Sequence, residues 1–204
     1  LQGAMLGLLL AYWFYPPTTE LLNRLAELKE RWGYGYAAVS AIVAGAVIPE
    51  VLRVLLFQRG IVRRTNWENL AFTIPFWGLM GTTVDAFYRV QAFWFGAEAT
   101  FPVVFKKVLV DQLIYTPFFA SPVTAILYDW KNRGYGLHHF RSFFTPAYFR
   151  DAVLPTIVAN WGVWVPVVSV VYSLPSLLQV PLFGLALSMW VILYTWMSER
   201  RTQA

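Results

Sequence analysis

Apolar residues run along this chain in long stretches that are separated by short polar segments. The first stretch long enough to cross a bilayer as a helix covers residues 34–57, because about twenty apolar residues span the hydrocarbon layer. Further stretches cover residues 70–90, 101–127, 152–174 and 175–197. This pattern predicts an all-α integral membrane protein, a helix bundle with four to five transmembrane helices.

The first 33 residues have a different pattern. Residues 1–15 are apolar but too few to span a bilayer, and Pro16 and Pro17 end them. In residues 20–31, Leu21, Leu25 and Leu28 recur at helical spacing among charged residues, which predicts a short amphipathic helix lying on the membrane. We therefore expect an apolar stub and an interfacial helix in 1–33, and a single transmembrane domain in 34–204. Because the chain begins with Leu1, we expect a processed or truncated N-terminus.

Composition narrows the class of protein. Of 204 residues, 58% are hydrophobic and 13% charged, which leaves too much apolar surface for a disordered chain. The net charge of +5 comes from Lys and Arg residues spread between apolar stretches, as in membrane proteins. No nucleic-acid partner is expected, because a nucleic-acid-binding protein would concentrate them on a polar domain. The alternative to a membrane protein is a very apolar soluble domain.

Few residues offer cofactor or metal chemistry. The chain has no cysteine and two histidines, so we expect no transition-metal site. Gly33-x-Gly35-x-x-Ala38 matches a dinucleotide-binding pattern, but it opens a predicted membrane span and follows no strand. Phosphate-binding loops, nucleophile elbows and zinc-protease motifs are missing from the sequence. We expect no cofactor and no catalytic site.

Small residues indicate close helix contacts. Ala37, Ala41 and Gly45 lie four residues apart in the first span, a spacing that lets helix backbones approach closely in lipid. Gly3 and Gly7 have the same spacing, which favours self-association. Together with the predicted spans, this gives the expected partners as the lipid bilayer, other copies of the chain and small solutes.

Charged residues inside the predicted spans are costly and usually face a partner or a cavity. Three acid–base pairs are of this kind, each with residues three or four apart on one helix face. They are Glu50 with Arg53, Asp85 with Arg89, and Lys107 with Asp111, which is followed by Gln112. Either each pair only neutralises itself within the bundle, or the three line one polar pathway across it.

The fourth span carries the run Asn160-Trp161-Gly-Val-Trp164-Val-Pro166. Asn160 and Trp164 are four residues apart and share a helix face, so Asn160 can bond a neighbouring helix. Pro166 and, in the third span, Pro117 remove helix hydrogen bonds and predict kinks. The alternative for the tryptophan pair is packing and anchoring at the membrane interface.

Two of these segments resemble a known family. The run from Lys107 through Asp111 and Gln112 to Pro117 reproduces K-x-x-x-D-Q-x-x-x-x-P, and Asn160-Trp161-Gly-Val-Trp164 reproduces N-W-x-x-W. Both resemble the 22-kDa peroxisomal membrane protein family, also called the Mpv-seventeen family. The chain departs from that family where Asp85 replaces the usual histidine, and where Glu50 and Arg53 replace the usual aspartate and glutamine.

The resemblance implies a divergent member of a family of small multi-span proteins in mitochondrial inner or peroxisomal membranes. Some members are described as weakly selective channels, and no catalytic activity is established for the family. Three hypotheses follow for this chain. The first is a weakly selective passage for small solutes in an organelle-type membrane. The second is a structural or scaffolding membrane protein, and the third is an intramembrane enzyme acting on lipid.

Overall fold

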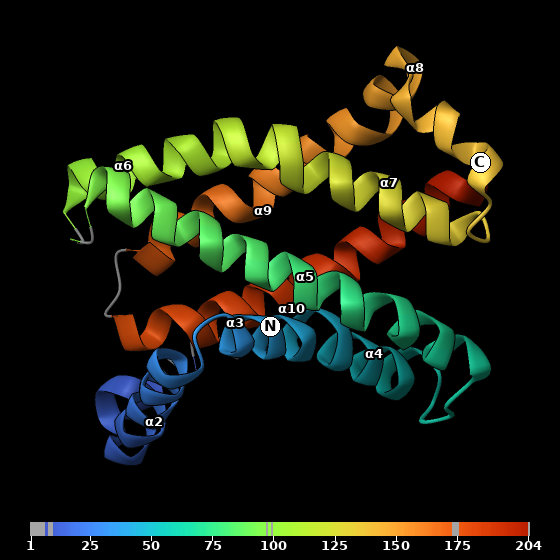
Figure 1. The fold of residues 1–204 in the computed structure, drawn as a ribbon. Coiled ribbons are helices and arrows are strands. Elements are labelled where there is room, and N and C mark those ends of the chain that lie inside the picture. Colours follow the sequence, from blue (N-terminus) through green and yellow to red (C-terminus); the bar gives the residue numbers. More distant parts are fainter. Residues whose placement is uncertain (1–6, 8–9, 97, 99, 173–175, 204) are drawn as a thin grey trace. The chain divides into compact units, whose positions relative to one another are not determined.

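The computed structural model describes residues 7, 10–96, 98, 100–172 and 176–203, so Gly3 and most of the N-terminal stub lie outside it. The described residues form helices and the turns between them, which confirms the all-α class (Figure 1). They divide into two compact units. Unit 1 contains residues 1–97 and 170–191, and unit 2 contains residues 98–169 and 192–204.

In unit 1, α2 (Pro16–Trp32) is followed by a long helix that turns back on α5 (Arg64–Phe95). The long helix consists of α3 (Tyr34–Ile42), η1 (Val43–Val47), α4 (Ile48–Leu52) and η2 (Arg53–Phe57). Gly33 joins it to α2 with a φ of +51°, a conformation that glycine adopts without the steric cost of a side chain. The first part of α10 (Ser176–Gln203) also belongs to this unit.

Small residues let the long helix and α5 touch, as their spacing predicts. A Cβ added to Gly81 of α5 would lie 2.6 Å from the carbonyl oxygen of Ala37. A Cβ added to Gly45 would lie 2.6 Å from the ring of Trp77. Neither position has room for a side chain, so these glycines set the distance between the two helices.

In unit 2, two long helical segments run antiparallel. The first consists of α6 (Phe101–Val110), η3 (Asp111–Ala120) and α7 (Ser121–Asn132), and the second of α8 (Pro146–Tyr148), η5 (Phe149–Val153) and α9 (Leu154–Tyr172). A 3-10 helix, η4 (Leu137–Phe144), joins them, so the polar stretch after the third predicted span is mostly helical. A buried apolar cluster holds the segments together: Ala125, Phe143, Tyr148, Ala152, Val153 and Ile157.

Four of the described segments, η1, η2, η3 and η5, are π-helical, and all but η2 have a proline within them or two residues beyond their end. The prolines are Pro49 after η1, Pro117 inside η3 and Pro155 after η5. A π-helix bonds each N–H to the carbonyl five residues earlier, and proline has no N–H. Each proline therefore leaves a carbonyl five residues before it without its helical donor.

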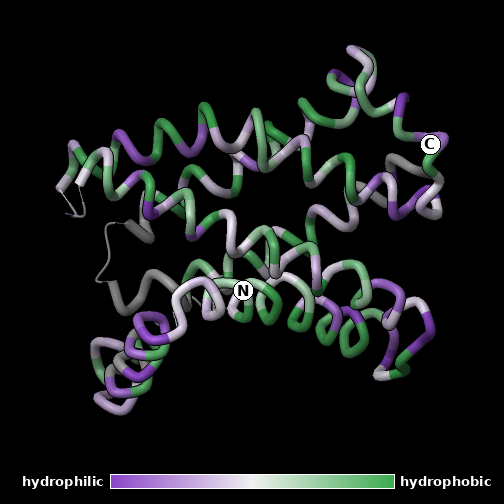
Figure 2. Tube along the Cα trace, viewed as in Figure 1, coloured by the Kyte–Doolittle hydropathy of each residue, from purple (hydrophilic) through white to green (hydrophobic). Residues whose placement is uncertain are grey.

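In the described part of the chain, two helical segments are long and apolar enough to cross a membrane, namely Tyr34–Phe57 and Pro146–Ser169. Leu182–Met197 is apolar but shorter. Figure 2 shows hydrophobic residues along α3 and α4 and hydrophilic ones in the connection from that helix to α5. The other predicted spans are helical over much of their length, whereas the junction of the fourth and fifth lies at residues 173–175, outside the described part of the chain.

Candidate functional site

In unit 1 the long helix and α5 form a hairpin, and Glu50 on the long helix contacts the start of α5. The side-chain nitrogen Nδ2 of Asn66 donates a hydrogen bond to Oε1 of Glu50. Asn66 is buried at the start of α5, where its Oδ1 also accepts the backbone N–H of Arg63 at 2.6 Å. Glu50 therefore helps to fix the first turn of α5. Arg53 is half-buried one turn further along the same helix.

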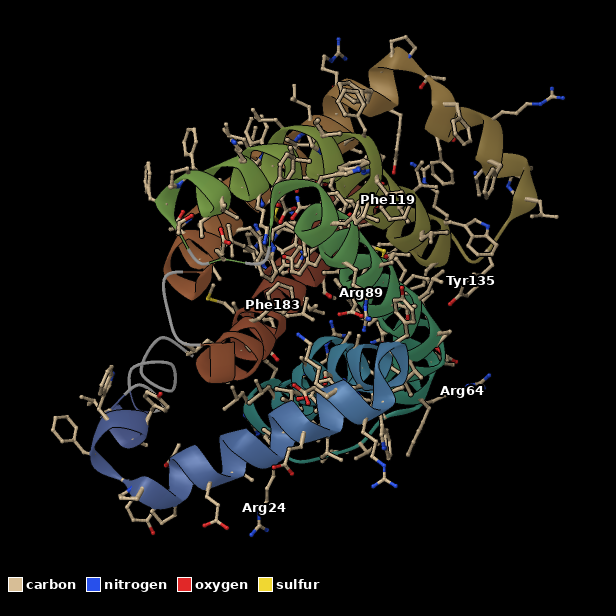
Figure 3. The ribbon with its side chains drawn as sticks, turned by 60° about the vertical axis from the view of Figure 1, so that its left-hand side comes forward. Arg24, Arg64, Arg89, Phe119, Tyr135 and Phe183 are labelled. Carbon is tan, nitrogen blue, oxygen red and sulfur yellow. The ribbon has the colours of Figure 1, made fainter. Side chains whose placement is uncertain are left out.

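Asp85 and Arg89 form the ion pair that their spacing predicts. Arg89 Nε lies 2.8 Å from Asp85 Oδ2, and the guanidinium carbon Cζ of Arg89 lies 4.7 Å from the ring centroid of Tyr34. Arg89 thus contacts the start of α3, whereas Arg24 and Arg64 extend away from the ribbon (Figure 3). A cation over an aromatic ring is attracted by the ring's electrons, so Arg89 ties α5 to α3.

Glu50 and Asp85, the acidic residues predicted to lie inside the spans of unit 1, are at opposite ends of the hairpin. Glu50 contacts Asn66, and Asp85 is nineteen residues further along α5 (85 − 66). At about 1.5 Å per residue this separation is about 28 Å, close to the roughly 30 Å hydrocarbon thickness of a bilayer. The structure therefore does not bring Glu50 and Asp85 into one polar site.

The other predicted polar residues, Lys107, Asp111 and Gln112, lie in unit 2. Asp111 and Gln112 are buried at the start of η3, with exposed fractions of 6% and 5%, and Lys107 is half-buried one turn before them. Asp111 and Gln112 begin a row of buried polar side chains along the helix, in which the later members follow at intervals of three to five residues. The row is Asp111, Gln112, Thr116, Ser121, Thr124 and Asp129.

The second helical segment of unit 2 also buries polar residues. Thr156 and Asn160 are buried on α9, and Trp164 is buried one turn after Asn160, as their shared face predicts. Because the segments are antiparallel and Trp161 contacts Gln112, Asn160 lies at the level of Gln112 and Thr116. At the other end of the row, the Tyr148 hydroxyl donates to Asp129 Oδ2 at 2.9 Å.

Some oxygens of this buried row have no partner in the described part of the chain. The hydroxyls of Thr124 and Thr156 donate to carbonyls of their own helices at 2.6 and 2.8 Å. Gln112 Oε1, Ser121 Oγ and Asn160 Oδ1 have no hydrogen-bond partner. A buried acceptor left unpaired costs about 1–3 kcal/mol, so these positions favour water or a hydrogen-bond-donating solute.

The outer faces of the same helices are apolar. In unit 2 the exposed side recurs at Phe101, Phe105, Leu109, Leu113 and Phe118. In unit 1 it recurs at Val39, Val43, Val47, Val51 and Leu55, opposite the small residues that face α5. These helices thus expose apolar residues, while those of unit 2 also bury polar ones, the reverse of the usual arrangement in soluble proteins.

Two side chains take the carbonyls that the prolines leave free. The indole Nε1 of Trp161 donates to the carbonyl oxygen of Gln112 at 2.7 Å, five residues before Pro117. The Ser188 hydroxyl lies 2.7 Å from the carbonyl oxygen of Ala44, five residues before Pro49, and is fully buried. Pro166 lies inside α9, and the missing Cβ of Gly162, four residues before it, faces open space.

Sequence reasoning missed the hydroxyl residues of the buried row and the role of Ser188. The signal for the row was present, because Thr116, Ser121 and Thr124 recur at helical spacing within an apolar stretch. The contact of Ser188 with Ala44 joins residues 144 positions apart, and no local pattern encodes it. Trp161 packs against the buried apolar cluster, as the packing alternative predicts, and its indole N–H has in addition a specific acceptor that the sequence does not indicate.

Among the described residues, no group of three or more His, Asp or Glu side chains lies close enough together to hold a metal ion. The fold and site define an all-helical protein, whose described residues include two helices long and apolar enough to span a bilayer and a buried polar row in one unit. Comparisons with protein-family models, with curated proteins and with solved structures find no match.

Proposed function

We propose that the chain is a multi-pass membrane protein that provides a passage for small polar solutes. The exposed apolar stripes support the membrane part of this proposal. Leu113 and Phe118 are 53% and 79% exposed, on the same helical segment in which Asp111 is 6% exposed. In water such stripes would be an aggregation hazard, whereas in lipid they match the surrounding acyl chains.

In this proposal α5, α6 to α7 and α10 cross the membrane together with the two helical segments that are apolar enough to do so alone. That gives the four to five spans expected from the sequence. The polar contacts of Glu50 and Asp85 then lie near the two membrane surfaces. Such positions make charged groups tolerable, because their side chains reach the headgroup region.

The main support for a solute passage is that several buried side-chain oxygens have no hydrogen-bond partner in the described residues. From Asp111 to Asp129 the polar row covers eighteen residues (129 − 111), about 27 Å of helix, which approaches the hydrocarbon thickness. Since lipid offers no hydrogen-bond donor, Gln112 Oε1, Ser121 Oγ and Asn160 Oδ1 require water or a solute there. Both signs of charge are present at Lys107 and Asp111, which favours weak charge selectivity.

Conductance in planar bilayers and swelling of proteoliposomes in urea or glycerol test the passage. The proposal predicts solute flux through the wild type and a loss of at least half of it in Asn160→Leu, because leucine removes the polar group. Val158→Leu is the matched control, since Val158 is an exposed neighbour on the same helix. Absence of flux in the wild type, or equal flux in both variants, refutes the passage.

A scaffolding function is the second candidate, and the side-chain bonds to freed carbonyls favour it. Trp161 and Ser188 each fix one helix against another, which is what a structural role requires. Under this function the Asp85–Arg89 pair matters only as a pair. Exchanging the two residues, as Asp85→Arg with Arg89→Asp, keeps the ion pair but moves the cation away from Tyr34. The exchange is then expected to preserve more cellular function than Arg89→Met, which removes both contacts.

The relationship to the 22-kDa peroxisomal membrane protein family is part of the proposal. Its support is that the two segments carrying the resemblance touch each other, through Trp161 and the carbonyl of Gln112. The Pro117 of the first motif is also the residue that leaves this carbonyl free. On this basis we propose an organelle membrane, mitochondrial inner or peroxisomal, as the location.

A further inference from the structure

The connection between the two long segments of unit 2 is the most one-sidedly charged part of the described chain. Residues 130–150 contain Lys131, Arg133, Arg141 and Arg150, two histidines and no acidic residue. The acidic residues that flank the connection already have partners. Asp129 is buried and accepts the Tyr148 hydroxyl, and Asp151 lies 2.7 Å from Arg150. Within residues 130–150 there is therefore no acidic side chain to pair with Arg133 or Arg141.

Apolar side chains project from the same connection. Leu137 and Phe144 of η4 are 77% and 72% exposed. Tyr135 projects from the turn between α7 and η4 (Figure 3). Behind them, Trp130 contacts the rings of Tyr135 and Phe140, with centroid distances of 5.0 and 6.3 Å. Because these ring contacts hold the connection together, its exposed apolar side chains can enter the edge of a lipid layer without unfolding the segment.

The cations lie beside these apolar residues. The guanidinium carbon of Arg133 is 5.2 Å from the ring centroid of Phe143, which keeps Arg133 next to η4. Arg141 lies within η4 and is exposed. Neither arginine forms an ion pair with a residue that the structure describes. Both therefore have donors available for an outside anion.

We propose that residues 130–150 bind the headgroups of anionic phospholipids. The connection joins the two antiparallel helical segments of unit 2 at the end where both would leave the bilayer. Basic residues at that depth attract anionic headgroups, and the exposed Leu137 and Phe144 reach the acyl boundary below them. The mixture of exposed apolar residues and uncompensated cations favours a lipid surface over a nucleic acid, for which the apolar side chains have no use. The proposal rests on the membrane embedding proposed above, but not on the solute passage.

Titration of the full chain in neutral detergent micelles with dioctanoyl phosphatidylglycerol tests this binding, with dioctanoyl phosphatidylcholine as the neutral lipid. Tryptophan fluorescence reports the dissociation constant. Each cation near the headgroups contributes about a fivefold factor in affinity. The double variant Arg133→Gln with Arg141→Gln is therefore expected to bind the anionic lipid about 25-fold more weakly and the neutral lipid unchanged.

The matched control is Arg24→Gln with Arg64→Gln, because these exposed arginines already pair with Glu20 and Glu68. This control is expected to bind like the wild type. Equal weakening in both double variants, or no preference of the wild type for the anionic lipid, overturns the proposal. So does equal binding of inorganic phosphate or of a single-stranded oligonucleotide. Circular dichroism verifies that each variant is folded, and carbonate extraction of proteoliposomes tests membrane embedding separately.

Discussion

The indole N–H of Trp161 donates a hydrogen bond of 2.7 Å to the backbone carbonyl of Gln112, 49 residues earlier in the chain. That carbonyl lies five residues before Pro117, within the π-helix η3. In the π-helical register, residue 117 would supply the donor, and proline has none. The side chain of one helix thus completes the backbone of another. The bond also holds the two helices in register at this point.

Replacement of Trp161 by phenylalanine is expected to destabilise the protein, because the Gln112 carbonyl remains buried without a donor. The expected loss in the free energy of unfolding is about 1–3 kcal/mol. In a Pro117→Ala background the backbone N–H of residue 117 can serve the carbonyl, so the same replacement should cost about 1 kcal/mol less. Denaturant unfolding of the four proteins, followed by circular dichroism, measures this coupling. Additive effects would show that the bond and the proline are independent.

Ser188 and Pro49 form an equivalent arrangement in unit 1. The Ser188→Ala variant should lose about 1 kcal/mol of stability, since the Ala44 carbonyl loses its donor. Pro49→Ala supplies an N–H in the π-helical register and should remove most of that loss. Ser142→Ala is the control, because Ser142 is exposed and bonds within its own turn. A Ser188→Ala variant as stable as the wild type would contradict this arrangement.

Glycine positions in the unit 1 hairpin should respond to alanine in opposite directions. Gly81→Ala places a methyl group against the Ala37 carbonyl, and overpacking of this kind costs about 1–3 kcal/mol. Gly35→Ala meets nothing within 4 Å and raises helix propensity, so it should be neutral or stabilising by up to about 1 kcal/mol. Thermal unfolding in one detergent compares the two variants. Equal melting temperatures would mean that the helices are not in close contact there.

His139 should titrate below the ordinary histidine range. Partial burial, then the neighbouring His138 and Arg133, lower the pKa of its imidazole from about 6.5. Because the unfolded chain then takes up its proton first, the stability that the neutral ring provides is complete above about pH 6.5. It decreases as the pH falls through the lower pKa of the folded state. Two-dimensional NMR of the imidazole signals measures the pKa, and His138→Asn is expected to raise it. A pKa of His139 above 6.5 would contradict this electrostatic account.

The parts of the structure that could be predicted from the sequence are those that local spacing encodes. The all-α class, the helix Tyr34–Phe57, the small-residue contact with α5 and the Asp85–Arg89 pair all follow from residues within one or two turns of each other. The π-helical segments could not be predicted this way. They shift the register by about one residue per turn, and hydropathy periodicity over a short window does not resolve that shift.

The other differences between the sequence prediction and the structure concern residues that are far apart in the sequence. The sequence predicts charged pairs inside three spans, but it does not say at which depth each pair lies. Because the two helices are antiparallel, Glu50 lies near the turn, at Asn66, and Asp85 lies toward the other end, where Arg89 contacts Tyr34. The polar residues that are most completely buried carry hydroxyl and amide groups, in both units: Ser188 and Gln91 in unit 1, and Thr156 and Ser121 in unit 2. A sequence survey for charged residues overlooks such groups.

The central claim is that the buried polar row contacts water while the exposed apolar stripe contacts lipid. Because the chain has no cysteine, single cysteines can be placed in an otherwise unreactive background. The most direct measurement is labelling of Thr116→Cys and Phe118→Cys in proteoliposomes with a small, charged thiosulfonate reagent. The account predicts that Cys at 116 reacts and Cys at 118 is protected. Labelling at 118 with protection at 116 would instead indicate a water-soluble protein with a dry core, and protection at both would exclude the passage.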